Sequence, residues 1–530
     1  MAETPKSATR AQGGLLRAAM TVGGFTLISR LTGFTRDILI AALLGAGPIG
    51  DAFFVAFKLP NFFRRLFAEG AFNAAFIPRF SAHLKQDGRD TAHGFAEETL
   101  AVLLSVLLLF VALAQAAMPV LMLGLAPGFR DDPATFELAV ELTRITFPYL
   151  LFISLVSLMA GVLNGVGRFA AAAATPILLN LSLIAALLLL VGKVPTAGHA
   201  LAIGVFVAGI VQFAWLLVAL RRAGLPLYLP RPRLTPAVRK VLAIMGPAAI
   251  GAGVVQVNLV IDIILASFLQ DGAISYLFYA DRISQLPIGV VGVAVGTALL
   301  PLLSRQAAAG EDTAARQSLN RALEIGLLLS LPAMAACLAI PGELVAGLFQ
   351  RGAFTAADTN ATAMTLAAYA AGLPAYVMIK VLGPAFFARS DTMTPLKIAI
   401  VAVMVNVALN LALMGPLQQV GLALATAISS WLNAGLAIWL LHRRGWLKAD
   451  ARLRAAVGKA AFASAIMAGV LVAAATALAP MTGLGEVMRA TGLAVLVVLG
   501  LLTYVVLAQV TGLARLRDLR AMMRGRGDAP

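Results

Sequence analysis

The sequence contains a single cysteine, Cys337, and few charged side chains, which make up 12% of its 530 residues. One thiol excludes a disulfide framework within the chain. The four histidines (His83, His93, His199 and His442) have neither a metal-ligand spacing nor paired ligands, which argues against a metal site. The N-terminal stretch lacks a signal-peptide core and a small-residue cleavage site. The first apolar run is therefore expected to be a retained helix.

The polar content is too low for a soluble globular class, because 60% of the residues are apolar and the mean hydropathy is +0.90. The apolar runs are about 18–25 residues long, which suits helices and not the ten-residue strands of a barrel. We predict an all-α polytopic membrane protein with about 14 helices. Their expected ranges are 15–46, 51–82, 95–123, 136–164, 172–193, 199–220, 241–269, 273–304, 320–349, 357–388, 394–414, 420–441, 459–480 and 486–511.

The net charge of +16 follows the predicted topology. If each loop is numbered by the predicted helix that it follows, 29 of the 41 Lys and Arg residues lie in or next to the two tails and the even-numbered loops. Only four lie in or next to the odd-numbered loops, and the other eight lie within predicted helices. By the positive-inside rule, both termini and the basic loops are expected on the cytoplasmic side of the membrane. The charge is therefore no sign of nucleic-acid binding.

The chain repeats itself at an offset near 225. DILIAALLGAG (37–47) aligns without a gap on DIILASFLQDG (262–272), and IPRFSAHLKQDGRDTA (77–92) resembles LPLLSRQAAAGEDTA (300–314). The offset equals six predicted helices, so both copies have the same orientation, as in transporters that bind substrate between two halves. The predicted parts are an N-terminal six-helix bundle (1–220), a cytoplasmic linker (221–240), a C-terminal six-helix bundle (241–441), a second linker (442–458), two extra helices (459–511) and a basic tail (512–530).

Cationic residues lie inside the first two predicted helices, where a charge costs about 2.5–3.5 kcal/mol unless it faces protein or water. Arg30 and Asp37 share a face of the first helix, next to Arg36. In the second helix Asp51, Lys58 and Arg65 follow a seven-residue spacing and predict one polar stripe. Arg64 and Glu69 lie beside this stripe, and Pro60 should free the backbone carbonyl of Ala56.

The second half carries fewer charges: Asp262 occupies the position of Asp37 in the repeat, and Asp281 precedes Arg282 in the next helix. Arginine presents a planar fork that suits phosphate and carboxylate groups. The surplus of cations therefore predicts a phosphorylated amphiphile or organic anion as the ligand. The alternative is that Asp–Arg pairs join helices and bind nothing.

The block SRLTGFTRD (29–37) with DAFFVAFKLPNFFRRLFAEGAFNAAFIP (51–78) closely resembles the MurJ (MviN) family of bacterial lipid II flippases. YADRISQLPIGVVGVAVGTALLP (279–301), APGF (126–129) and FQRGAFTAAD (349–358) are also similar. The resemblance spans nearly the whole chain. It implies the multidrug/oligosaccharidyl-lipid/polysaccharide exporter fold with 14 helices. It also implies transport of the undecaprenyl-diphosphate-linked peptidoglycan precursor, lipid II, to the periplasmic leaflet, and no enzymatic activity.

Carried over to this chain, the resemblance assigns substrate binding to Arg30, Arg36, Arg64 and Arg282, and gating or arginine orientation to Asp37, Asp51 and Glu69. From their places on the polar stripe, Lys58 is a further candidate for substrate binding and Arg65 for gating or arginine orientation. The two extra helices would line a groove for the polyprenyl tail. Lipid II, membrane lipids and the cell-wall synthesis machinery are the partners it implies.

The resemblance leaves open whether a coupling ion or the membrane potential drives transport. Some members bind sodium between two helices of the second half, and Asp262 and Asp391 are the candidate ligands here. An exporter of another polyprenyl-linked glycan remains an alternative, because phosphate contacts do not read sugars. An integral-membrane transferase is the other alternative, but the loops contain no paired acidic or histidine set for catalysis.

Overall fold

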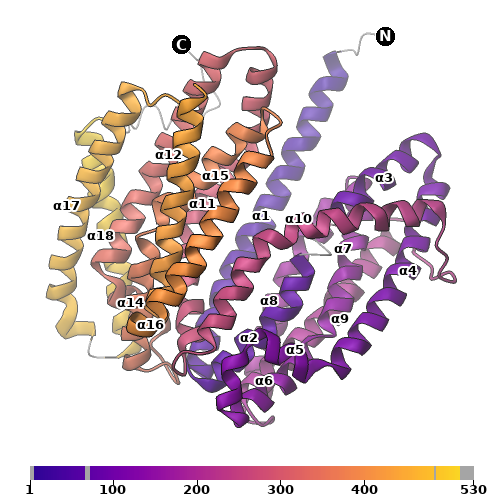
Figure 1. Ribbon diagram of the computed structural model, residues 1–530, viewed down its shortest axis with the longest axis horizontal. Helices are drawn as coiled ribbons and strands as arrows, with labels where there is room; N and C mark the ends of the chain where they lie inside the picture. The colour runs from indigo at the N-terminus through magenta and orange to yellow at the C-terminus, as the bar shows by residue number, and fades with distance from the viewer. Residues whose placement is uncertain (1–4, 66–71, 483–484, 514–530) are drawn as a thin grey trace. The chain divides into compact units, whose positions relative to one another are not determined.

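A computed structural model describes residues 5–65, 72–482 and 485–513, and it divides the chain into two compact units, Met1–Ile274 and Ser275–Pro530. The described residues form helices and connecting turns, without a β-strand (Figure 1). This confirms the predicted all-α class. Each unit is described separately.

The first unit contains one long helix, α1, and shorter helices that pack on each other. Its elements are α1 (Pro5–Leu44), α2 (Pro48–Phe63), α3 (Asn73–Gln86), α4 (Arg89–Ala116), α5 (Met118–Leu125), the 3-10 helix η2 (Pro127–Asp131), α6 (Pro133–Thr146), α7 (Tyr149–Gly165), α8 (Phe169–Leu190), α9 (Ala197–Arg222) and α10 (Pro236–Ala266). Helix α8 packs between α1 and α9, and α9 also contacts α7 (Figure 1). Helix α10, assigned by the repeat to the C-terminal bundle, packs on α3, α4 and α5 of the first unit.

The second unit continues from α11 (Ala273–Ala308), whose first two residues belong to the first unit. The other helices are α12 (Asp312–Ala339), α13 (Pro341–Phe349), α14 (Ala356–Ala370), α15 (Leu373–Phe387), α16 (Met393–Arg443), α17 (Ala451–Thr482) and α18 (Glu486–Val510). Within α16, Gln418 has φ 51° and ψ −135°, so this segment is two helices joined by a turn, as the predicted ranges 394–414 and 420–441 require.

Several predicted helices are broken in the structure where prolines occur. Helices α6 and α7 meet at Pro148, and α13 begins at Pro341 directly after α12. Proline lacks the amide donor that a continuous helix needs but fits the first turn of a new one. Among the described residues, eight helices are long and apolar enough to cross a membrane, or nine if the bent pair α14–α15 counts as one. The chain is thus a multi-pass membrane protein, and the number of 14 crossings stays a prediction.

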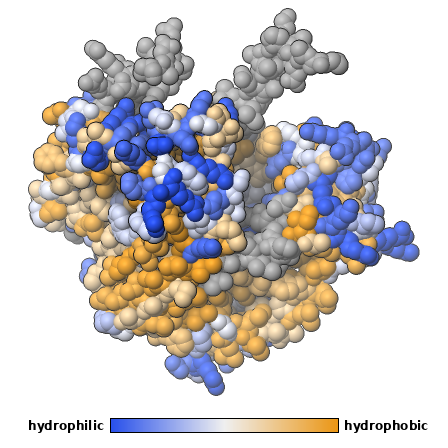
Figure 2. Space-filling view, turned by 45° about the horizontal axis from the view of Figure 1, so that its top comes forward, coloured by the Kyte–Doolittle hydropathy of each residue, from blue (hydrophilic) through white to orange (hydrophobic). Residues whose placement is uncertain are grey.

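The two helices beyond the repeat, α17 and α18, pack on the second unit. Met467, Leu471 and Leu496 form a buried cluster with Ile340 at the α12–α13 junction, and the Tyr504 hydroxyl donates to the Leu328 carbonyl at 2.8 Å. Many other α18 side chains are exposed and apolar, including Val510 at 78%. In Figure 2 apolar side chains form a broad zone on the visible face, with hydrophilic ones gathered at its edges. Such a zone fits contact with lipid hydrocarbon.

Candidate functional site

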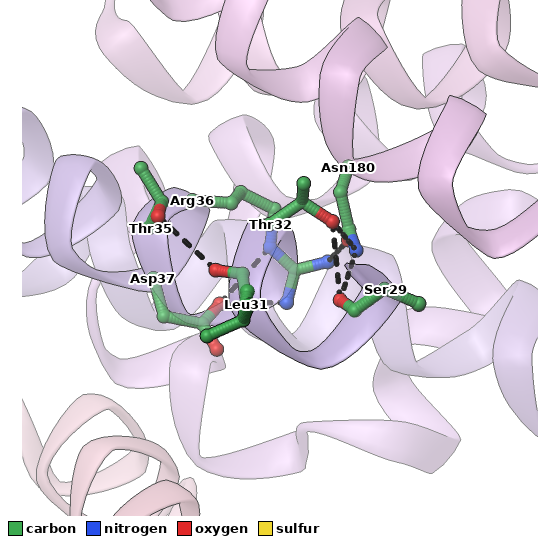
Figure 3. Close-up of polar contacts among 7 residues, drawn as sticks. All are labelled: Ser29, Leu31, Thr32, Thr35, Arg36, Asp37 and Asn180. Carbon is green, nitrogen blue, oxygen red and sulfur yellow. Dashed lines mark hydrogen bonds and ion pairs between the residues drawn. The ribbon is translucent and has the colours of Figure 1, made fainter. Parts of the chain in front are cut away.

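Arg36 and Asp37 lie buried on α1, only 7% and 3% exposed. The Arg36 Nε and Nη2 atoms donate to Asp37 Oδ1 at 3.0 and 2.6 Å (Figure 3). The Arg36 Nη1 atom donates to Asn180 Oδ1 on α8 at 2.8 Å. The guanidinium is therefore held by two groups from two helices, which fixes its plane.

Asn180 also binds the backbone of α1, because its Nδ2 donates to the Ser29 carbonyl at 2.9 Å and to Thr32 Oγ1 at 3.2 Å (Figure 3). A Cβ on Gly33 would lie 3.2 Å from Asn180 Nδ2. Gly33 thus permits a close approach of α8 to α1. Sequence reasoning missed Asn180. The sequence signal that could have identified Asn180 is an asparagine within an apolar run, because asparagine side chains form hydrogen bonds between helices in membranes.

Arg30 lies on α1 six residues before Arg36 and is exposed. In the part of the chain that the structure describes, Arg30 forms no ion pair with a carboxylate. One helix therefore carries a buried, oriented guanidinium and an exposed one. This arrangement can present positive charge to an anion outside the helix.

Asp51 on α2 is 3% exposed, and its Oδ2 accepts a hydrogen bond from the Gly272 backbone N–H at 2.8 Å. Gly272 lies in the turn between α10 and α11, where its φ of +88° favours glycine. Asp51 therefore holds the connection that leads into α11. The gating position that the family resemblance assigns to Asp51 stays a prediction.

We expect Asp51→Ala to lower the unfolding temperature and transport, because it leaves the buried Gly272 amide without an acceptor at a cost of about 1–3 kcal/mol. Asp51→Asn keeps an acceptor oxygen and is the matched control, with a smaller effect on both. Thermal unfolding in detergent and transport in vesicles measure the two quantities. Equal unfolding temperatures and transport rates of Asp51→Ala and the wild type would show that Asp51 does not hold the α10–α11 turn.

Pro60 frees the Ala56 carbonyl as predicted, and the structure shows what accepts this bond. The Thr146 hydroxyl at the end of α6 donates to Ala56 O at 3.0 Å, and Thr146 is fully buried. The predicted stripe changes from buried Asp51 and half-buried Lys58 on α2 to exposed Arg65, which lies two residues beyond the end of α2. Half-buried Arg64 donates from Nε to Asn61 Oδ1 at 3.2 Å. Glu69 lies outside the described residues.

Arg282 belongs to the second unit. It is half-buried on α11, with its guanidinium carbon 4.6 Å from the centre of the Phe278 ring. Its neighbour Asp281 accepts a hydrogen bond from Gln285 one turn later. The contact places the cationic group against the face of an aromatic ring, which attracts it electrostatically.

The two candidate sodium ligands are occupied by protein groups. Asp262 accepts from Asn258 Nδ2 at 3.4 Å. Asp391 lies between α15 and α16, and its Oδ2 is 2.5 Å from Arg444 Nη1 while its Oδ1 accepts from the Thr394 N–H at 2.9 Å. A carboxylate paired with arginine does not fit a cation ligand. Within the described ranges no three His, Cys, Asp or Glu residues are grouped as metal ligands.

These contacts predict how Asp391 responds to pH. Burial raises the pKa of Asp391, but hydrogen bonds from Thr394 and Arg444 outweigh it and lower the pKa to about 2. The stabilisation is therefore present above the ordinary value of 3.8 and is lost as the pH falls toward 2. We expect Asp391→Asn to lower the unfolding temperature at pH 7 and to lose this difference progressively below pH 4. If the difference in unfolding temperature between Asp391→Asn and the wild type depended on sodium at constant ionic strength, Asp391 would be a sodium ligand and not a partner of Arg444 alone.

Comparison with known proteins decides the family. A family model described as lipid II flippase MurJ matches residues 40–492. The chain belongs to the MurJ family. A "Probable lipid II flippase MurJ" of Rhizobium tropici is 43% identical over 97% of this chain and 98% of its own length. The relative of the same name in Rhizobium meliloti (strain 1021) is 47% identical over 87% of this chain and 86% of its own length.

Solved structures agree with the MurJ assignment. A structure described as lipid II flippase MurJ in an inward closed conformation matches with a TM-score of 0.78 and 25% identity, covering 94% of this chain and 99% of that one. An inward-facing MATE family transporter of the MOP superfamily matches with a TM-score of 0.64 and 15% identity, covering 78% of this chain and 94% of its own. The second likeness shows the shared fold alone. Together they confirm the predicted exporter fold.

Proposed function

We propose that this MurJ family member is a lipid II flippase, a transporter and not an enzyme. The single observation that carries the proposal is the pair Arg30 and Arg36 on α1, one exposed and one buried and oriented by Asp37 and Asn180. A diphosphate has planar sets of oxygens that accept the parallel N–H bonds of arginine. The family supplies the identity of the molecule that carries this diphosphate.

The proposed mechanism is alternating access. Arg30, Arg36 and Arg282 bind the diphosphate of the headgroup, with Arg64 and Lys58 as further cations. The polyprenyl tail stays in the lipid. Conformational change then exposes the headgroup to the opposite side, with Asp37, Asp51, Arg65 and Glu69 orienting the arginines or closing the route. Repetition of related helices along the chain supports this mechanism.

The proposed orientation places both termini in the cytoplasm, since the tails and even-numbered loops hold most of the Lys and Arg residues. Lipid II therefore moves from the cytoplasmic to the periplasmic leaflet. Contact with the cell-wall synthesis machinery, the energy source and the division into two bundles and an extension stay predictions.

The deciding experiment depletes the protein in its host and measures which leaflet holds the lipid-linked precursor, with a probe that reaches only the periplasmic face. We expect the precursor to accumulate on the cytoplasmic side. Wild-type protein should restore its arrival, whereas Arg30→Ala and Arg282→Ala should not, at equal amounts in the membrane. Normal arrival under depletion, with no movement by the purified protein in vesicles, would refute the proposal.

A further inference from the structure

A pocket of about 540 Å³ lies at the end of the first unit where α1, α8 and α9 meet. Its walls include Phe25 of α1, Phe169 at the start of α8 and Trp215 of α9. Two arginines line it as well: Arg168, immediately before α8, and Arg222, the last residue of α9. The pocket is thus apolar with cationic groups at the helix ends.

The two arginines are not neutralised by the chain. Both are exposed, no acidic residue lines the pocket, and within the described ranges neither guanidinium is within ion-pair distance of a carboxylate. Arg168 Nη1 reaches the Arg222 carbonyl at 3.4 Å, the outer limit of a hydrogen bond. Most of their ten N–H donors remain available to another molecule.

Arginines at helix ends in the second unit behave differently. Arg389 pairs with Asp312 at 2.8 Å, and Arg444 pairs with Asp391 at 2.5 Å. The absence of a carboxylate partner therefore distinguishes Arg168 and Arg222 from these two arginines.

One aromatic wall of the pocket, Trp215, is held by a hydrogen bond. Trp215 is 42% exposed, and its Nε1 donates to the Ala171 carbonyl at 3.0 Å, which ties α9 to α8 and directs the indole along the pocket. An amphipathic ring next to arginine is the usual composition of a protein surface at the level of lipid headgroups.

We infer that this pocket binds the headgroup of an anionic phospholipid. The phosphate accepts from Arg168 and Arg222, and the glycerol and first methylene groups lie against Phe25, Phe169 and Trp215. A volume of about 540 Å³ accommodates that part of the lipid, and the remaining hydrocarbon stays in the bilayer. With the proposed orientation the pocket faces the cytoplasmic leaflet, whose anionic lipids attract basic pockets between helices.

This site is separate from the substrate arginines, but its position gives it a structural role. Phe25 lies on α1, the helix that carries Arg30 and Arg36 further along. A lipid between Phe25 and the α8 and α9 ends therefore joins one end of α1 to the rest of the first unit.

Trp215 allows the site to be tested directly. In a Trp431→Phe, Trp439→Phe, Trp446→Phe background Trp215 is the only tryptophan. The protein is reconstituted in vesicles that contain brominated phosphatidylglycerol or brominated phosphatidylcholine, whose bromines quench indole fluorescence on contact. We expect half-maximal quenching at a mole fraction roughly 30-fold lower for phosphatidylglycerol, since each of the two arginines contributes about 1 kcal/mol near a membrane surface and 1.4 kcal/mol is a factor of ten. Arg168→Gln with Arg222→Gln should remove this preference.

A second protein with Trp439 as its only tryptophan is the matched control. Trp439 is 50% exposed and has the Arg443 guanidinium 5.0 Å from its ring, but it lies on α16. The same preference at Trp439 would mean general surface attraction and would overturn the site. Relief of the quenching by excess inorganic phosphate would show that a soluble anion is bound, which also overturns it.

A further measurement needs no tryptophan replacement. Phosphatidylglycerol should raise the unfolding temperature of the wild type in detergent more than phosphatidylcholine does, because a ligand that binds the native state stabilises it. The difference should disappear in Arg168→Gln, Arg222→Gln. An unchanged difference would refute the inference and would leave the proposed lipid II transport untouched.

Discussion

Arg36→Gln is expected to lower transport roughly 30-fold or more, and adding Asp37→Asn should restore stability without restoring transport. The single substitution removes the guanidinium that donates two hydrogen bonds to the buried Asp37 carboxylate. Removing one partner of a buried pair costs roughly 3–5 kcal/mol, whereas replacing both partners is often neutral. The unfolding temperature should therefore fall in the single variant and recover in the double variant.

Transport separates ligand binding from a purely structural role. If Arg36 donates to the diphosphate, both variants lose a charge-assisted contact, which costs about 2–5 kcal/mol. At 1.4 kcal/mol for each factor of ten, transport should fall roughly 30-fold or more in both variants. Reconstituted vesicles with a labelled polyprenyl-diphosphate substrate measure this rate.

Arg144→Gln is the matched control for a lost positive charge. Arg144 is an exposed arginine on α6 of the same unit, and the described hydrogen bond at this residue uses its backbone carbonyl. This variant should transport at the wild-type rate. If Arg36→Gln, Asp37→Asn also transports at that rate, the buried pair only joins helices and binds no substrate.

The sequence predicted features that depend on local chemistry. Arg36 and Asp37 are adjacent in the chain, so an Asp–Arg pair was already one of the two alternatives for these charges. The missing helical hydrogen bond at the Ala56 carbonyl followed from Pro60, because a proline in a helix leaves the carbonyl four residues earlier without its donor. Long apolar runs likewise predicted the helices, since the bilayer permits few other structures.

Contacts between distant segments could not be predicted. Asn180 is 144 residues from Arg36, and nothing in an apolar helix tells which neighbour its amide will face. The pairing of Asp391 with Arg444 depends on how the turn at Gln418 returns the chain. The helix breaks near Pro148 and Pro341 lie inside continuous apolar runs, where hydropathy alone does not show a break.

The contact at Gly128 is another one between distant segments that the sequence could not predict. Replacement of Gly128 is expected to disrupt the first unit. In η2 a Cβ on Gly128 would lie 2.1 Å from the Ser267 carbonyl oxygen and 2.6 Å from the Phe268 nitrogen. The Gly128 N–H also donates to Ser267 Oγ at 3.1 Å. The glycine thus permits backbone-to-backbone contact between η2 and the end of α10, close to the turn that Asp51 holds.

Gly128→Ala should therefore cost at least about 3 kcal/mol, the upper part of the range for overpacking, because backbone cannot rotate away as a side chain can. We expect a lower unfolding temperature and a transport loss of roughly tenfold or more, since the α10–α11 connection is displaced. Gly124→Ala is the control, because Gly124 lies in neighbouring α5 with nothing within 4 Å of the added Cβ. It should be neutral or stabilise by up to about 1 kcal/mol.

Adding Ser267→Ala should not rescue Gly128→Ala, because the clash is with the carbonyl and not with the hydroxyl. Rescue by that second change, or equal stability of the two alanine variants, would show that η2 does not pack against α10 in this way.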